Sequence, residues 1–156
     1  MHGGVIRHAG PADAAGVLAC LLAAFAPYRG AYTEAAFRDT VLDEASVPRR
    51  LDEWCVLVAE APAGAIAGTV GGAASGSDGH IRGMAVRPEF AGSGMAQALL
   101  DAIEAELRSR GAVRITLDTT RPLRRAMRFY ERNGYRRTGV ERDFFAMPLI
   151  EYAKAL

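Results

Sequence analysis

The stretch Met84–Leu100, MAVRPEFAGSGMAQALL, organises the elements on either side of it. It opens as a short apolar run, breaks at Pro88, passes through Gly92-Ser93-Gly94 and then takes the apolar spacing of a helix. A strand that leads through a glycine turn into a helix presents unpaired main-chain N–H groups and the positive end of the helix dipole. Because the turn residues are small, they leave that main chain open. The stretch therefore predicts a site for a pyrophosphate-bearing ligand.

The composition places limits on the class of protein. The chain has 156 residues, half of them apolar, and a net charge of +1. This fits a single domain over residues 1–156 without the basic excess of a nucleic-acid binder. Cys20 and Cys55 lie far apart in apolar contexts, which predicts buried reduced thiols and no metal site. Since no stretch approaches about 18 apolar residues and no leader is recognisable, we expect a cytoplasmic protein without a membrane span.

Hydrophobic periodicity predicts alternating strands and helices. Strands are expected at 5–8, 54–60, 65–74, 80–86, 113–118, 135–140 and 143–149. Helices are expected at 14–25, 33–44, 94–110 and 122–133, with 48–52 as a connector. Short turns join the strands between 54 and 86 into an antiparallel meander, in which Gly68, Gly71 and Gly72 indicate close packing or a bulge.

The strand at 113–118 follows a strand–helix crossover, so it is expected to lie parallel to the strand at 80–86. The predicted fold class is α/β. It has a mixed, mostly antiparallel sheet, one parallel strand pair in the middle and helices on both faces.

A dinucleotide site is one alternative for the glycine turn. Gly92 and Gly94 resemble the start of G-x-G-x-x-G, and Asp118 stands about 20 residues further on. However, the third glycine is replaced by Gln97, and five residues separate the strand from the first glycine. Too little chain follows to complete a doubly wound sheet, and no Lys-Ser/Thr follows the glycines, as a P-loop requires.

Three separated motifs fit another family better in both order and spacing. They are Met84-Ala85-Val86-x-Pro88, Gly92-x-Gly94-x-Ala96 and Ala126-x-x-Phe129-Tyr130-Glu131-x-x-Gly134-Tyr135. Together they resemble the GCN5-related N-acetyltransferase (GNAT) family over nearly the whole chain, from residue 5 to about residue 149. The resemblance implies acetyl-CoA as cosubstrate, held in a V-shaped gap where the strands at 80–86 and 113–118 splay apart.

The resemblance also implies particular contacts. The main chain at 84–86 would pair with the pantetheine arm, whose two amides need partners. The glycine turn would hold the pyrophosphate. The arginines of the helix at 122–133 are spaced as a solvated stripe, but Arg121 or Arg125, near the helix start, could instead meet the 3′-phosphate. The family usually has Arg or Gln where Ala91 stands, and often Asn where Leu123 stands. The cofactor-binding residues expected are Met84, Ala85, Val86, Ala91, Gly92, Ser93, Gly94, Met95, Ala96, Gln97 and Phe129.

Two residues are candidates for the chemistry. An attacking amine must lose a proton, and His80, with an ordinary pKa near 6.5, could take it; alternatively, His80 caps a turn after Asp78-Gly79. The family's general-acid tyrosine corresponds to Tyr130, which would protonate the CoA thiolate; alternatively, Tyr130 is a core residue.

The function expected is acetyl-CoA-dependent N-acetyl transfer to a primary amine. The alternative is a non-catalytic module that binds or senses acyl-CoA. The acceptor is a small molecule or a protein, with no nucleic acid or membrane involved, and a homodimer is common in the family. The side chains expected near the acceptor are Tyr28, Tyr32, Glu34, Phe37, Phe144 and Phe145.

Overall fold

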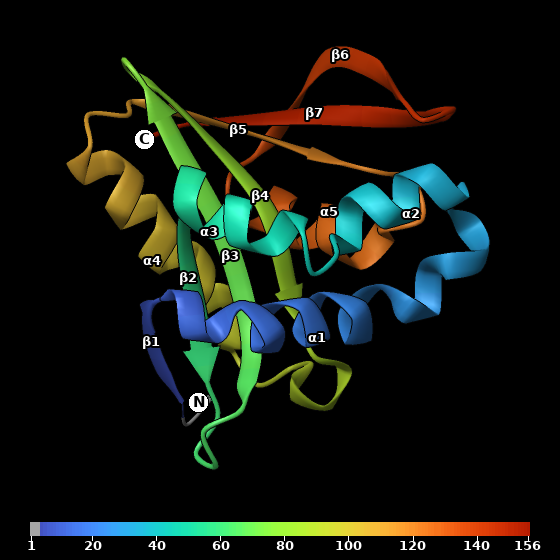
Figure 1. The fold of residues 1–156 in the computed structure, drawn as a ribbon. Helices are drawn as coiled ribbons and strands as arrows, with labels where there is room; N and C mark the ends of the chain where they lie inside the picture. The colour runs from blue at the N-terminus through green and yellow to red at the C-terminus, as the bar shows by residue number, and fades with distance from the viewer. Residues whose placement is uncertain (1–3) are drawn as a thin grey trace.

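The computed structural model describes residues 4–156, which form one seven-stranded sheet in the order β1-β2-β3-β4-β5-β7-β6 (Figure 1). Within the described chain, β4 and β5 are the parallel pair, and the other neighbouring strands run antiparallel. This confirms the expected α/β class. The strands are β1 Val5–His8, β2 Cys55–Glu60, β3 Ile66–Ser75, β4 Asp78–Val86, β5 Arg114–Thr119, β6 Arg136–Phe144 and β7 Met147–Ala155.

Helices cover both faces of the sheet, as expected (Figure 1). They are α1 Ala14–Phe25, α2 Glu34–Val41, α3 Ser46–Glu53, α4 Met95–Ser109 and α5 Arg124–Arg132, with 3-10 turns at Pro11–Asp13, Ala26–Ala31 and Pro88–Phe90. The first three helices enclose one apolar core with the sheet, and α4 and α5 enclose the other. The site is therefore built on a sheet that is held from both sides.

The prediction of a connector at 48–52 is wrong, because that segment lies inside α3. The carboxylate of Asp43 accepts hydrogen bonds from the N–H groups of Ala45 (3.0 Å) and Ser46 (2.8 Å) and so stabilises the helix start. Pro48 falls in the first turn, where its missing N–H removes no helical hydrogen bond. Val47 is buried, so tertiary packing also supports the helix.

The closing hairpin is longer than predicted. Strands β6 and β7 extend to a two-residue turn, Phe145-Ala146, and β7 lies between β5 and β6. Both turn residues have positive φ (50° and 70°), the conformation that matches the twist of a tight hairpin. Ile150 and Tyr152 of β7 are buried in the core, which explains why the strand continues well beyond residue 149.

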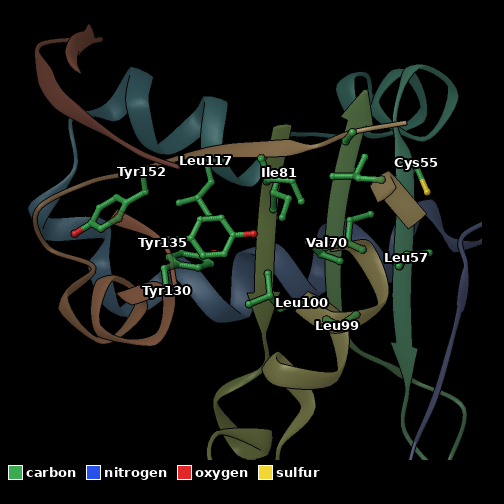
Figure 2. Close-up of a cluster of buried hydrophobic side chains, with 14 of the residues drawn as sticks. Cys55, Leu57, Val70, Ile81, Leu99, Leu100, Leu117, Tyr130, Tyr135 and Tyr152 are labelled. Carbon is green, nitrogen blue, oxygen red and sulfur yellow. The ribbon is translucent and has the colours of Figure 1, made fainter. Parts of the chain in front are cut away.

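Glycines of β3 allow α4 to pack closely on the sheet. A Cβ atom at Gly72 would lie 2.8 Å from Cγ1 of Ile103, and one at Gly68 would lie 2.8 Å from Cδ1 of Leu99. The close packing inferred from the glycines is confirmed, whereas the bulge in this pairing belongs to β4, where Gly83 and Met84 oppose Val70 of β3. Figure 2 shows the resulting core, with Leu99 beside the inner sheet residues.

The N-terminal helical segment corrects the expectation that no stretch of the chain is long and apolar enough to be tested as a membrane span. Pro11–Ala31 covers 21 residues and contains an 18-residue window with a mean hydropathy of 1.4, so the segment is long and apolar enough to cross a membrane by length and composition alone. In the fold, Val17, Cys20 and Leu21 of this segment are buried in the core. A core helix passes the same test, so this finding does not establish a membrane span. Cys20 and Cys55 are free and buried, as predicted.

Candidate active site

Strands β4 and β5 diverge at the centre of the sheet. They pair from Asp78 with Arg114 as far as Ile81 with Leu117, and no pairing follows. On the other side of β4, the register with β3 shifts between Thr69 and Gly71, because two residues of β4 oppose one of β3. A bulge bends its strand and increases the local twist. The C-terminal half of β4 is therefore left without a hydrogen-bonded neighbour on the β5 side.

A cavity of about 940 Å³ lies at this divergence. Its walls come from β4, β5, the start of α4, α5, the end of α1 and its connection to α2, residues of α2 and α3, and the closing hairpin. The expected site residues that line it are His80, Met84, Ala85, Val86, Ala91, Gly92, Gly94, Met95, Ala96, Gln97, Phe129 and Tyr130.

Some expected residues lie elsewhere. Ser93 does not line the cavity; its hydroxyl instead accepts a hydrogen bond from the N–H of Met95 at 3.4 Å. Among the aromatics expected near the acceptor, Tyr28, Tyr32 and Phe144 do line it. Glu34 and Phe145 are exposed outside the cavity, whereas Phe37 is buried in the core beneath α1.

The glycine turn presents main-chain donors to the cavity. Gly92 and Gly94 have φ of 75° and 87°, which glycine adopts without steric strain. The first helical hydrogen bond of α4 runs from the N–H of Ala98 to the carbonyl of Gly94. The N–H groups of Gly92, Gly94, Ala96 and Gln97 make no hydrogen bond to any residue between 4 and 156. The turn is thus a cluster of free donors at a helix N-terminus, a geometry that suits an anion.

His80 lies within β4 rather than at a turn, so the turn-capping alternative is wrong. Its Nδ1 lies 2.7 Å from the hydroxyl oxygen of Thr116 on β5, and its Nε2 lies 3.6 Å from a carboxylate oxygen of Asp118. The Thr116 hydroxyl also lies 3.5 Å from the carbonyl oxygen of Gly79, to which it can donate. Burial lowers the pKa of His80 below 6.5, while the Asp118 charge opposes this shift.

Sequence reasoning did not select Asp118 as a partner of His80. It lies on β5 two residues beyond Thr116, which pairs with His80, and so it is on the same face. Burial raises its pKa, and the nearby charges of His80 and Arg142 oppose that shift. A guanidinium N–H of Arg142 reaches the second carboxylate oxygen at 3.4 Å. The predicted parallel pairing of the two strands was the signal that could have identified this residue.

Tyr130 is carried by α5 and is buried against other aromatic rings. Its ring centroid lies 5.4 Å from that of Phe129 and 5.8 Å from that of Tyr135, and its hydroxyl makes no hydrogen bond to another described residue. Burial raises the pKa of Tyr130 well above 10, so the phenol stays protonated at neutral pH. Figure 2 shows these tyrosines at one side of the core, beside Leu117.

Beneath Tyr130, a buried polar network anchors its neighbour. The Tyr135 hydroxyl donates to a carboxylate oxygen of Glu104 at 2.7 Å, and the ammonium of Lys154 donates to the same carboxylate at 3.0 Å. A second polar feature is the Thr119 hydroxyl, which is buried without a partner among the described residues and lines the cavity at the end of β5. Tyr130 therefore lines the cavity and packs on the ring of Tyr135, which its hydrogen bond to Glu104 holds in place.

Comparison with known proteins now defines the class. The chain matches the acetyltransferase (GNAT) family model over residues 19–135 and belongs to that family. It is similar to a GCN5-related N-acetyltransferase from Rhodopseudomonas palustris, with 26% identity, a TM-score of 0.80 and coverage of 100% of this chain and 98% of that one.

Two further structures share the fold at lower identity. The PaiA N-acetyltransferase from Thermoplasma acidophilum, solved in complex with coenzyme A, has 18% identity, a TM-score of 0.80 and coverage of 98% and 99%. The ribosomal-protein-S18-alanine N-acetyltransferase from Escherichia coli has 17% identity, a TM-score of 0.72 and coverage of 97% and 93%.

Proposed function

We propose that this protein is an acetyl-CoA-dependent N-acetyltransferase in which a primary amine attacks the thioester directly, with His80 as the base and Tyr130 as the acid. The observation that carries the proposal is the divergence of β4 from β5 beyond Ile81 and Leu117, over a cavity that both residues line. Membership of the GNAT family and the CoA complex of a similar fold support the cosubstrate.

The residues present fit the three parts of acetyl-CoA. The unpaired edge of β4 at 84–86 offers main-chain groups to the pantetheine amides, and the buried hydroxyl of Thr119 is a further polar partner. The free N–H groups between Gly92 and Gln97 suit the pyrophosphate. Arg125 also lines the cavity and is our candidate for the 3′-phosphate. Because most of these contacts use main chain, alanine at position 91 and leucine at position 123 are compatible with binding.

The proposed chemistry assigns one proton transfer to each residue. Bound acetyl-CoA supplies the activated acyl group; the amine nitrogen bonds to the carbonyl carbon and the carbon–sulfur bond breaks. An alkylamine with a pKa of about 10.4 is neutral only about once in a few thousand at pH 7, a handicap of roughly 4–5 kcal/mol. His80, kept neutral by burial, takes the amine proton on its imidazole ring. Tyr130, kept protonated by burial, donates its hydroxyl hydrogen to the departing thiolate.

The decisive variant is Tyr130→Phe. It keeps the ring that packs on Phe129 and Tyr135 and removes only the hydroxyl. We expect kcat to fall by about 10²-fold, the lower end for a lost acid catalyst, with CoA affinity unchanged by calorimetry. An unchanged kcat with a good amine substrate would show that the assigned role is wrong.

A melting comparison tests the cosubstrate separately. Ligand at about 100 times its Kd stabilises the folded state by roughly 2.7 kcal/mol, so CoA should raise Tm visibly and NAD should not. A protein that CoA stabilises, yet that releases no thiol from acetyl-CoA with any amine in a broad panel, would instead be an acyl-CoA-binding module. The acceptor in this proposal is an amine-bearing small molecule or protein, and neither a nucleic acid nor a membrane takes part. The proposal allows a homodimer. It places the protein in a reducing cytoplasm, in which the free thiols persist.

A further inference from the structure

Two arginines flank a single indole next to His80. The guanidinium carbon of Arg82 lies 5.3 Å from the Trp54 ring centroid, and that of Arg50 lies 5.8 Å from it. The edge of the same indole meets the His80 ring at a centroid distance of 6.2 Å. Both arginines and His80 line the cavity. The guanidinium groups of Arg50 and Arg82 and the imidazole of His80 thus all pack on the Trp54 ring.

Arg50 makes no direct ion pair within the described chain, although the charge of Asp39, which lines the same cavity, acts on it. It is half-buried on α3, and neither an ion pair nor a hydrogen bond joins its guanidinium to any residue from 4 to 156. Burial, followed by repulsion from Arg82, lowers its pKa to about 10. Arg82 has one ion pair, to Asp39 at 3.8 Å, with both side chains about 41% exposed. Exposed pairs of that kind are weak, so Asp39 only partly offsets the positive charge that the two guanidinium groups bring to the cavity.

The main chain of β4 makes room for Arg50. Gly83 sits in the bulge with φ of 66°, and a Cβ atom there would lie 3.0 Å from Nη1 of Arg50. Glycine at this position adopts the positive φ without strain. Because it has no side chain, it also leaves room for the Arg50 guanidinium where β4 diverges from β5. Burying two guanidinium groups beside one shared carboxylate is unfavourable, so an arrangement that brings Arg50 and Arg82 to the cavity indicates an anionic ligand that completes it.

We propose that Arg50 and Arg82 bind an oxyanion group of the acceptor, so that the acceptor is an amine that also carries a carboxylate or a phosphate. This inference rests on the proposed function and names the substrate class of the same site. A guanidinium presents a planar fork of donors that matches either oxyanion. With the anion held beside Trp54, the amine of a short acceptor is directed toward His80. Polyamines, by contrast, would meet two positive charges there.

The test compares matched acceptors in thiol release from acetyl-CoA. Amino acids are paired with their uncharged amides, and phosphoethanolamine with ethanolamine, so the two arms separate carboxylate from phosphate. We expect the anionic member of one pair to have a kcat/KM about 10- to 100-fold above that of its partner, the range for a charged hydrogen bond. In Arg50→Gln that advantage should disappear through KM, with the neutral acceptor little changed.

Arg49→Gln is the matched control. Arg49 is exposed on the same helix and does not line the cavity, so removing its charge should leave the preference intact. A CoA-induced rise in Tm verifies that Arg50→Gln is folded. The same discrimination in the wild type and Arg50→Gln, or a preference for neutral or cationic amines, would overturn the inference.

A second readout keeps the anion site testable if no amine is acetylated. Inorganic phosphate and N-acetylglycine, which carries a carboxylate and no amine, are added in a melting experiment with CoA present. One of them should raise Tm of the wild type and of Arg49→Gln but not of Arg50→Gln. No shift with either anion refutes the anion site, whereas a shift without thiol release refutes the proposed catalysis and leaves the anion site standing.

Discussion

The electrostatic pair of His80 and Asp118 makes a quantitative prediction for the variant Asp118→Asn. Burial lowers the pKa of His80, and the Asp118 carboxylate is the largest influence that opposes this shift, with Glu151 acting in the same sense; the charges of Arg82 and Arg142 lower the pKa further. Asp118→Asn removes the main influence that raises the pKa of His80, and the effect of burial remains. The pKa of the base should therefore fall further, and His80 should stay neutral to a lower pH.

The size of the shift follows from the geometry. Nε2 lies 3.6 Å from the carboxylate oxygen, and two unit charges at that separation interact by about 1.2 kcal/mol in water and about 4.6 kcal/mol at an effective dielectric constant of 20. The His80 side chain is 34% exposed, and Arg142 shares the carboxylate, so the lower end applies. At 1.36 kcal/mol per unit, we expect the pKa to fall by about one unit.

The assay is kcat at saturating acetyl-CoA and amine between about pH 5 and pH 8. In the wild type kcat should fall as the pH drops through a pKa below 6.5, because His80 then becomes protonated and cannot accept the amine proton. In Asp118→Asn this acid limb should move to lower pH, and in His80→Gln it should vanish. Since the acceptor's own protonation is common to all variants, it does not affect the difference between them.

Asp143→Asn is the control, because it removes the same charge from an exposed position on β6 outside the cavity. Its acid limb should match that of the wild type. An unmoved limb in Asp118→Asn, or a limb that persists in His80→Gln, would refute His80 as the base whose pKa Asp118 supports.

Two further variants test the packing and the hairpin. Gly72→Ala would place a Cβ atom 2.8 Å from Cγ1 of Ile103, and such overpacking should lower the free energy of unfolding by about 1–3 kcal/mol. Urea unfolding measures this loss. The control Gly30→Ala, whose Cβ atom would meet nothing within 4 Å, should change stability little. Ala146→Gly should relieve the positive φ of 70° in the turn after Phe145 and raise Tm by about 1–3 °C in a melting scan; a fall in Tm would show that the turn carries no such strain.

Local chemistry was sufficient to predict several elements. The apolar spacing of α1 and α4, the glycine turn at Gly92 and the short turns of the meander each depend on neighbours within a few residues. Local patterns did not predict α3, because Pro48 alone indicates a break, whereas the helix is supported by the burial of Val47 in a core shared with distant elements. They also did not set the length of β7, which depends on the burial of Tyr152 between distant elements.

The sequence by itself was enough for the class of fold, which follows from the order and periodicity of the elements, and for the position of the glycine turn, which is marked by a short motif. The family resemblance supplied the candidates His80 and Tyr130. Only the tertiary structure paired Asp118 with His80 and brought Arg50 to the cavity. Those side chains meet across strands and helices that are far apart in the chain, and the pairing register and the bulge at Gly83 set their distances. No local sequence pattern encodes the distance between two such side chains, because that distance results from the packing of the whole sheet.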